Sequence, residues 1–389
     1  MAEEAAQALF PEQEKAAAEP DFTTGVLPSQ GIREAISRDE ILATEEIAEA
    51  QIQPASLDLR LGPWAYRVRA SFLPGKRATV GQKLEALSMH RIDLGRGAVL
   101  EKDCVYIAPL MESVRLRHRT SAVANPKSST GRLDIFARVI TDYGTEFDHV
   151  RAGYRGPLWA EISPRSFSVL VRTGSRLVQL RIKRGSPAPS DVALRRLHEQ
   201  VGLVDAGEEA VIKKGLLAVT VDTQGPGGKG HDGAGLVGYR AKKNTDLIDI
   251  EKVGHYDPLD YWEPIIAHRN QGIVLDPDAF YILASKEAVT VPDDHAAEMI
   301  AYDTLVGEFR VHYAGFFDPG FGYAESGGEG SRAVLEIRSH DVPFILEDGQ
   351  IVGRLLYERL TAKPDKLYGR DIGSSYQRQG LALAKQFRR

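Results

Sequence analysis

The chain has 389 residues, of which 43% are hydrophobic and 26% are charged, and its formal net charge is -5. This length exceeds one ordinary hydrophobic core and predicts two domains of roughly 150–200 residues in a globular protein. The acidic balance argues against a general nucleic-acid-binding protein, which has a strongly basic face. The absence of a run of 18 or more apolar residues argues against a membrane span or membrane partner.

The single cysteine, Cys104, excludes an intrachain disulfide and fits a reducing cytoplasm, where we expect the protein to reside. It also excludes a zinc site that needs two or three thiolates from one chain. Cys104 lies in the apolar run V-L-E-K-D-C-V-Y-I and is expected to be buried. Residues 1–27 are acidic, lack the basic-then-apolar layout of a signal peptide, and are expected to form a mobile arm.

The first elements after the arm are predicted to be helical. Ser29 is a candidate N-cap for a short helix over 31–37, and D-E-I-L-A-T-E-E-I-A-E-A over 39–50 predicts a second helix. From residue 56 to 68 apolar and polar residues alternate, which predicts a hairpin or two short strands around Gly62–Pro63.

Short strand-like segments separated by turns then follow, as is typical of an all-β sandwich or barrel. They are A-V-L, V-Y-I-A-P-L, S-V-R-L, I-F-A-R-V-I, L-W-A-E-I, F-S-V-L-V and L-V-Q-L-R-I. K-R-G-S-P-A-P-S over 183–190 predicts a linker, and a helix is expected over 191–201 with Gly202 near its end. Strands resume from there to about residue 360.

An internal repeat with an offset of 175 residues explains this layout, because V-L-E-K-D-C-V-Y-I from Val99 recurs as V-L-D-P-D-A-F-Y-I from Val274. Four further pairs keep the same offset: Glu112–Leu116 with Glu287–Val291, Glu161 with Glu336, Gly174 with Gly349, and Leu180 with Leu355. We therefore predict two tandem copies of one β-rich domain, each led by a short helix. The expected division is 1–27 arm, 28–185 first domain, 186–209 linker and helix, and 210–389 second domain with a C-terminal lid.

One stretch gathers hydrogen-bond donors in a way that suits a polyanion such as phosphate. N-P-K-S-S-T-G-R-L over 125–133 contains Lys127, Ser128, Ser129 and Arg132, punctuated by Pro126 and Gly131. The punctuation argues against a regular helix or a strand interior. A solvated basic turn is the alternative interpretation.

The two copies differ at this stretch. With a slip of one residue, K-S-S-T-G-R aligns with D-T-L-V-G-E, so that Asp303 and Glu308 replace the Lys and the Arg. Conversely, F-F-D-P-G-F-G in the second copy contains Asp318, where the first copy has Arg151. Such complementary loss is expected if one site is built from both copies.

These motifs in order, K-S-S-T-G-R, D-P-G, V-L-E, and then Y-G and Y-Q-R-Q, resemble the dCTP deaminase family, whose fold is that of the trimeric dUTPases. The resemblance covers about 28–185 and 210–385 as two fused copies and implies a distorted β-barrel or jelly roll in each. It implies zinc-free hydrolysis of dCTP to dUTP and ammonia in deoxynucleotide biosynthesis, with dTTP as a plausible inhibitor. Mg²⁺ is expected only with the triphosphate, and three two-domain chains are the expected oligomer.

The resemblance also assigns residues. The catalytic positions correspond to Glu336, Arg132 and Ser128, and the substrate-binding positions to Lys127, Ser129, Ala314, Asp318, Val334, Tyr368 and Gln379. A tail lysine usual in the family falls on Ser375. Glu161 occupies the catalytic position of the first copy, but Arg151 replaces the Asp there and no tail follows, so that pocket is expected to be degenerate.

The residues themselves support parts of this assignment. Glu336 lies in A-V-L-E-I, whose apolar neighbours would desolvate it and raise its pKa, so that it could take and return protons. The alternative is an outward-facing Glu in an alternating strand. Arg132 could hold this carboxylate and offset charge on the reaction intermediate. Asp318 could bind a 3′-hydroxyl or simply form a turn, and the tail with Tyr368 and Gln379 could be a lid or a frayed end.

Three other functions remain open on sequence grounds. R-A-G-Y-R-G over 151–156 resembles the motif of a dUTP diphosphatase, although Arg151 stands where its water-activating Asp would be. A bifunctional enzyme that converts dCTP through to dUMP is the second alternative. A non-catalytic nucleotide-binding protein is the third.

Overall fold

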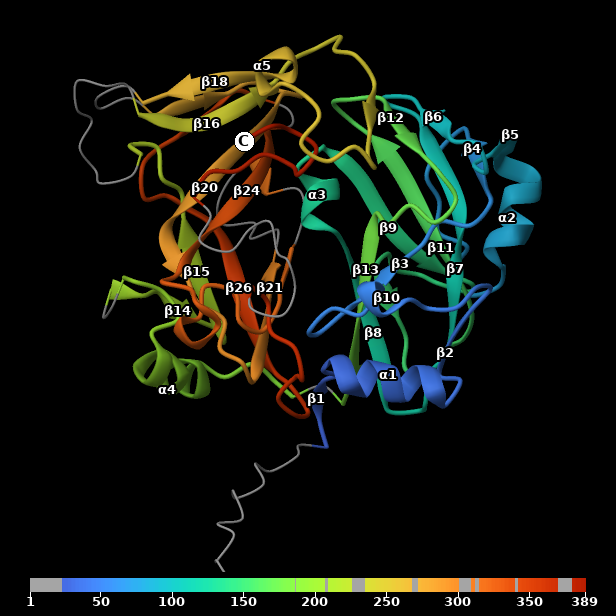
Figure 1. The fold of residues 1–389 in the computed structure, drawn as a ribbon, viewed down its shortest axis with the longest axis horizontal. Coiled ribbons are helices and arrows are strands. Elements are labelled where there is room, and N and C mark those ends of the chain that lie inside the picture. Colours follow the sequence, from blue (N-terminus) through green and yellow to red (C-terminus); the bar gives the residue numbers. More distant parts are fainter. Residues whose placement is uncertain are drawn as a thin grey trace, which may run out of the picture.

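The structure, a computed structural model, describes residues 23–185, 187–206, 209–225, 235–267, 272–300, 309–311, 315–339, 342–369 and 380–389. It consists of two β-rich halves that lie side by side (Figure 1). The predicted fold class, two tandem copies of a mainly β domain with short helices, is confirmed.

The first copy is built mainly from two antiparallel sheets. Its elements are β1 (Gly25–Val26), α1 (Ser29–Ser37), β2 (Ile41–Ala43), η1 (Glu49–Gln51), β3 (Leu57–Leu59), β4 (Trp64–Val68), α2 (Val80–Leu87), β5 (Ser88–Asp93), β6 (Ala98–Leu100), β7 (Val105–Arg115), β8 (Thr120–Pro126), α3 (Ser128–Gly131), β9 (Ile135–Thr141), β10 (His149–Val150), β11 (Arg155–Pro164), β12 (Val169–Val171) and β13 (Val178–Arg184). One sheet has the order β1-β13-β8-β10 with β3 beside β13, and the other has the order β5-β4-β7-β11-β9 with β2 beside β7.

The second copy repeats this plan. Its elements are α4 (Asp191–Val201), β14 (Ile212–Lys213), β15 (Leu216–Thr220), β16 (Leu236–Ala241), β17 (Ile248–Asp249), α5 (Pro258–Tyr261), β18 (Trp262–Ile266), β19 (Ile273–Leu275), β20 (Phe280–Val289), β21 (His295–Ile300), β22 (Phe309–Val311), β23 (Phe316–Phe317), η3 (Ala324–Ser326), β24 (Ser331–Ser339), β25 (Phe344–Leu346) and β26 (Ile351–Arg359). Its sheets have the orders β14-β15-β26-β21-β23, β18-β16-β20-β24-β22 and β19-β25.

The repeat seen in the sequence is a repeat of structural roles. The Tyr106 hydroxyl accepts a hydrogen bond from the Glu101 amide at 3.0 Å, and the Tyr281 hydroxyl accepts one from the Asp276 amide at 2.8 Å. In register, Glu161 lies opposite Ile107, and Glu336 lies opposite Ile282, 175 residues further on in both strands. Each pair therefore occupies the same place in its own sheet.

Glu112 and Glu287 form another such pair, because each carboxylate accepts a hydrogen bond from the backbone of a neighbouring strand. Glu112 Oε2 accepts from the Arg60 amide at 2.8 Å, and Glu287 Oε2 accepts from the Thr220 amide at 2.8 Å. The first copy adds an ion pair, in which Arg60 Nε donates to Glu112 Oε1 at 2.8 Å.

Several predicted elements differ from the structure. Residues 39–50 form no α-helix, because β2 pairs with β7 and tertiary pairing overrides the local helix propensity; only the 3-10 turn η1 begins at Glu49. Pro28, not Ser29, is the N-cap of α1, and Ser29 is the first residue of the helix. Residues 56–68 do contain two short strands, but β3 pairs with β13 and β4 pairs with β5 and β7, so they form no hairpin.

Two smaller predictions also need correction, and one is confirmed. Residues 128–131 form one α-helical turn, α3, although the sequence predicted no regular helix there. Cys104 is half-buried in the turn before β7 rather than buried within a strand. The helix over 191–201 is present, and Gly202 ends it with a left-handed φ of 69°.

Segments of the second copy and of the chain end pack onto the first copy. Strand β17 pairs in parallel with β12 of the first copy. Trp262 from the second copy and Phe387 from the last residues of the chain both belong to the first hydrophobic core. The described end of the chain is therefore anchored at the junction of the two copies, and Figure 1 marks the C-terminus between β16 and β24.

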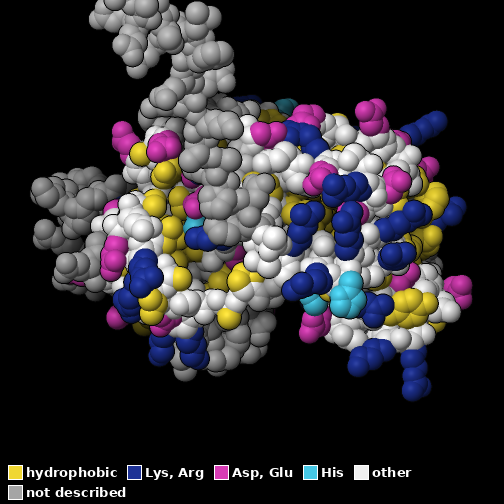
Figure 2. All heavy atoms as spheres, turned by 90° about the horizontal axis from the view of Figure 1, so that it is seen from below, with side chains coloured by type: hydrophobic (Ala, Val, Ile, Leu, Met, Phe, Trp, Pro, Cys, Tyr) yellow, Lys and Arg dark blue, Asp and Glu magenta, His cyan; other side chains and the backbone are white. Residues whose placement is uncertain are grey.

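No helix among the described residues is long and apolar enough to cross a membrane. Seen from below, the half formed by the first copy carries Lys and Arg side chains with Asp and Glu among them (Figure 2). That face is therefore of mixed charge rather than uniformly basic.

The buried Arg60–Glu112 pair gives a test of this packing. Glu112→Ala leaves a buried guanidinium without its carboxylate and should lower the free energy of unfolding by about 3–5 kcal/mol. The matched control is Glu34→Ala, which removes the exposed Arg38–Glu34 pair of α1 and should cost no more than about 0.5 kcal/mol. Urea denaturation of both variants measures the difference, and similar losses in the two would contradict the structural role assigned to Glu112.

Candidate functional site

Strand β24 positions the candidate site because its two faces have different partners. Leu335 and Ile337 point into the core of the second copy. The alternate residues Val334, Glu336 and Arg338 face the other way, as the two-residue period of a strand requires. Val334 packs against the core of the first copy, so this face of β24 is covered by the other half of the chain.

Glu336 contacts the short helix α3 of the first copy. A Cβ atom added to Gly131 would lie 2.7 Å from the Glu336 Cδ atom, so the carboxylate occupies the space that any side chain at residue 131 would need. Glu336 is 6% exposed. Burial raises the pKa of Glu336 to about 8, the Arg132 guanidinium opposes this rise, and the Asp134 carboxylate adds to it.

Arg132 is buried beside Glu336 and is held by the end of the chain. Its Nη1 atom donates a hydrogen bond to the Ala382 carbonyl oxygen at 3.2 Å. The first copy thus supplies the cation, the second copy supplies the carboxylate, and the C-terminal segment closes over the cation. The structure therefore brings the predicted residues Arg132 and Glu336 together.

Behind this pair lies a buried interdomain ion pair between Asp134 and Arg338. Asp134 also accepts a hydrogen bond from the Ser166 hydroxyl at 2.6 Å, and Arg338 also donates to the Asp278 carbonyl oxygen. Because Arg338 is two residues beyond Glu336 on the same face of β24, this network fixes the strand against the first copy.

Lys127 and Ser129 lie on a polar cavity of about 290 Å³, called here the cationic cavity. Its charged lining residues are Asp58, Lys127, Arg176, Glu251 and Lys385. Lys127 forms an ion pair with the buried Asp58, and Arg176 lies 3.8 Å from the same carboxylate. Burial and the nearby Lys127 both lower the pKa of Lys385. Three cations thus converge beside the hydroxyls of α3.

Asp318 is buried against the first copy. Arg181, which is fully buried, pairs with Asp318 at 3.4 Å and donates a hydrogen bond to the Ala297 carbonyl oxygen at 2.9 Å. Burial raises the pKa of Asp318, against the opposing charge of Arg181. Tyr368 packs its ring 5.7 Å from that of Phe321, in the turn after Asp318.

Other predicted positions are placed less fully. Ser128 is the first residue of α3 and is half-buried. Ala314, Gln379, Ser375 and the stretch from Asp303 to Glu308 lie outside the described residues. Arg151 is exposed in the turn after β10.

Glu161, the counterpart of Glu336, has different surroundings. Arg138 on the adjacent strand β9 lies opposite it and forms an ion pair at 2.5 Å. The Arg138 guanidinium lies 3.4 Å from the centre of the Phe147 ring. On this face of the sheet, Val80 and Leu84 of α2 pack with Ile107, which is the register partner of Glu161. The first copy therefore covers the equivalent carboxylate with its own residues.

Five charged residues that line the cationic cavity or pair with Asp318 were missed on sequence grounds: Asp58, Arg176, Arg181, Glu251 and Lys385. A signal existed for two of them, because Asp58 in S-L-D-L-R-L and Arg181 in L-V-Q-L-R-I interrupt apolar strand patterns. Buried charges are rare unless they are paired, so such interruptions indicate a site or an interface. Lys385 had no comparable signal, because the end of the chain gave no sign that it would be anchored.

Comparison with known proteins agrees with this geometry. Residues 23–186 match the model of the N-terminal domain, and residues 190–387 that of the C-terminal domain, of 2'-deoxycytidine 5'-triphosphate deaminase (DCD). The chain belongs to the dCTP deaminase family. A crystal structure of 2'-deoxycytidine 5'-triphosphate deaminase from Agrobacterium tumefaciens is similar, with a TM-score of 0.81 and 54% identity over 87% of this chain and 99% of that one.

Curated members of the dCTP deaminase family are also similar to parts of this chain. The protein named "dCTP deaminase, dUMP-forming" from Pseudarthrobacter chlorophenolicus is 29% identical over 151 residues, which are 37% of this chain and 75% of that protein. The protein of the same name from Mycolicibacterium vanbaalenii is 31% identical over 146 residues, 36% of this chain and 71% of that protein. Both matches are about the length of one copy of the repeat.

The contact between Gly131 and Glu336 leads to a direct test. Gly131→Ala would force the Glu336 carboxylate away from α3 and should lower the free energy of unfolding by about 1–3 kcal/mol. Gly81→Ala is the matched control, because its Cβ would meet only Thr79 Oγ1 at 3.8 Å in helix α2, and should be neutral or stabilise by up to about 1 kcal/mol. Denaturation curves should show a loss of stability in Gly131→Ala and none in Gly81→Ala, and a neutral Gly131→Ala variant would show that Glu336 lies elsewhere.

Proposed function

We propose that this protein hydrolytically deaminates dCTP, with Glu336 as the group that moves protons. The observation that carries the proposal is the position of Glu336, buried against α3 and beside Arg132, with a pKa raised to about 8. A carboxyl group with a pKa close to the working pH can both accept and donate a proton during one turnover. Membership of the dCTP deaminase family supports dCTP as the substrate.

One carboxylate can carry all the proton transfers of this reaction. Glu336 takes a proton from water as the water oxygen bonds to C4 of the cytosine, and it passes that proton to N3. Glu336 then takes the proton of the new C4 hydroxyl and delivers it to the amino nitrogen. The C4–N bond breaks, ammonia leaves, and the C4 carbonyl of uracil forms. The scheme routes no step through a metal ion.

The first copy would supply the groups that support this chemistry. The positive charge of Arg132 would offset charge that develops on the tetrahedral intermediate. Ser128, at the start of α3, would bond the attacking water or the amino group. Asp318 would accept a hydrogen bond from the 3′-hydroxyl, and Val334 would contact the base beside Glu336. Tyr368, Ala314 and Gln379 remain predicted substrate contacts.

The cationic cavity would hold the triphosphate. Lys127, Arg176 and Lys385 provide three positive charges, and Ser129 adds a hydroxyl. Lys385 and Arg176 would supply cations that Ser375 in the tail cannot. Mg²⁺ would arrive with the nucleotide, held by phosphate oxygens and water.

A second outcome is onward hydrolysis of dUTP to dUMP. It is favoured by the names of the curated relatives, which are called dUMP-forming. The exposed Arg151, where a diphosphatase would need a water-activating Asp, argues against it in the first copy. The predicted assembly of three chains also remains a proposal. The contact between Arg132 and Glu336 is already made within one chain.

The two glutamates of the repeat provide matched variants. Glu336→Gln should bind dCTP but lower the rate of ammonia release by about 1000-fold or more, because the amide cannot carry the protons. Glu161→Gln, at the equivalent place in the first copy, should keep a kcat within about threefold of the original. Ammonia release and dCTP binding by calorimetry measure both effects, and equal losses in the two variants would refute a single site per chain.

The same reactions identify the product. Chromatography of the nucleotide and an assay for pyrophosphate distinguish dUTP from dUMP. Ammonia without pyrophosphate indicates deamination alone, whereas equal amounts of the two indicate the dUMP-forming reaction. Pyrophosphate from added dUTP without ammonia from dCTP would contradict the proposed function.

A further inference from the structure

A second cavity, of about 460 Å³, lies between the two copies and carries an excess of positive charge. The first copy contributes Lys102 and Arg165, and the second contributes Arg240, Lys242 and Lys243. Its acidic lining residues are Glu263 and Asp278, and the cationic cavity at the proposed active site is lined by a different set of residues. We call this second cavity the interdomain cavity.

The cations of the interdomain cavity are not all neutralised by neighbours. Arg240 pairs with Asp276 at 2.9 Å, and Arg165 lies 3.6 Å from Asp103. Lys242 donates to the Leu259 carbonyl oxygen at 2.6 Å and pairs with no carboxylate among the residues that the structure describes. Lys102 and Lys243 are exposed, and neither forms a salt bridge with any residue in the described part of the chain.

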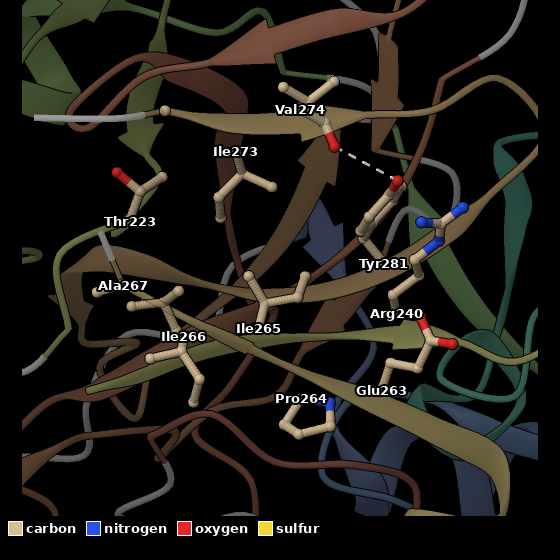
Figure 3. Close-up of a pocket in the computed structure, with 12 residues that line it drawn as sticks. Thr223, Arg240, Glu263, Pro264, Ile265, Ile266, Ala267, Ile273, Val274 and Tyr281 are labelled. Atoms are coloured by element: carbon tan, nitrogen blue, oxygen red, sulfur yellow. Dashed lines mark hydrogen bonds between the residues drawn. The ribbon is translucent and has the colours of Figure 1, made fainter. Parts of the chain in front are cut away.

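A neighbouring cavity of about 350 Å³ has a different character and helps to define the limits of this one. Arg240 and Glu263, which are register partners on β16 and β18, line both cavities. Beyond them the lining becomes apolar, with Ile265, Ile273 and Val274 (Figure 3). Charged groups are therefore concentrated on the interdomain side.

We propose that the interdomain cavity binds an oligophosphate, either free or as part of a nucleotide. Two arginines and three lysines around one concave space match the several negative charges of a phosphate chain, and the arginines add forked donors. The volume is that of an ordinary small-molecule site. Cations from both copies would contact the same ligand, so binding would hold the copies together.

The wall of this cavity is continuous with the junction behind Glu336. Ser166 lines the cavity and donates to Asp134, while Asp278, also on the wall, accepts from Arg338 through its backbone oxygen. Asp134 and Arg338 form the buried ion pair that joins the copies. A ligand in the cavity should therefore stabilise the folded chain, by an amount that rises with the logarithm of its concentration once this exceeds Kd.

Calorimetric titration with inorganic tripolyphosphate tests the proposal. The original protein should bind at two kinds of site, of which dCTP displaces only one. Lys102→Gln/Lys243→Gln should weaken the site that dCTP does not displace by about tenfold or more, because two charged contacts are lost, while basal ammonia release from dCTP stays unchanged. Lys76→Gln/Lys213→Gln, two exposed lysines on other parts of the molecule, is the matched control and should leave both sites intact.

Lys127→Gln separates this proposal from the proposed function. It should weaken only the site that dCTP displaces, so a failure there counts against the triphosphate site and not against the interdomain cavity. A parallel titration with ATP distinguishes the source of the phosphate chain: tighter binding than tripolyphosphate indicates a nucleotide, and equal binding indicates the phosphate chain alone. A single class of sites, or unchanged binding in Lys102→Gln/Lys243→Gln, would overturn the inference.

Discussion

The contact on which the site depends is that between a carboxylate of one copy and a glycine of the other. Gly131 has no side chain, so Glu336 can approach the backbone of α3 and lie beside Arg132. This approach removes the carboxylate from water and raises its pKa, and the nearby Arg132 guanidinium opposes the cost of ionising it. The same burial that weakens the fold makes the carboxyl group useful near neutral pH.

Duplication produced two copies of one sheet whose outer faces are covered differently. In the second copy, the face of β24 that carries Glu336 is covered by the first copy. In the first copy, the equivalent face of β11 carries Glu161 and is covered by α2, with Arg138 neutralising the charge. The strand pattern that the two copies share thus maintains the fold. What packs on the outer face of each sheet decides what the glutamate on that face can do.

Much of this arrangement could be predicted from the sequence, because the residues that recur in the repeat have the same structural role in both copies. Glu112 and Glu287 each bond to the backbone of a neighbouring strand, so their spacing reported the register of the sheets. The complementary loss of charges around Lys127 and Asp318 pointed to a site shared by the copies. Strand β2 could not be predicted, because it lies among helix-forming residues and its partner strand is about 70 residues away in the sequence. The anchoring of Lys385 was likewise hidden, since it depends on contacts with residues far away in the sequence, such as the Gly254 amide, which donates to the Lys385 carbonyl oxygen.

The most direct test of the shared site is the pH dependence of stability in the original protein and in Glu336→Gln. A carboxyl whose pKa rises from 4.5 unfolded to about 8 folded binds more protons in the folded state between these values. Stability from this group is therefore present at low pH and lost as pH rises towards about 8. We expect the original protein to lose stability relative to Glu336→Gln over this range. When Arg132 is replaced by Met in both proteins, the loss should continue to higher pH, because the guanidinium no longer holds the pKa of Glu336 down. A difference in the free energy of unfolding that stays constant between about pH 5 and 8, or that is unchanged by the replacement of Arg132, would contradict the shared site.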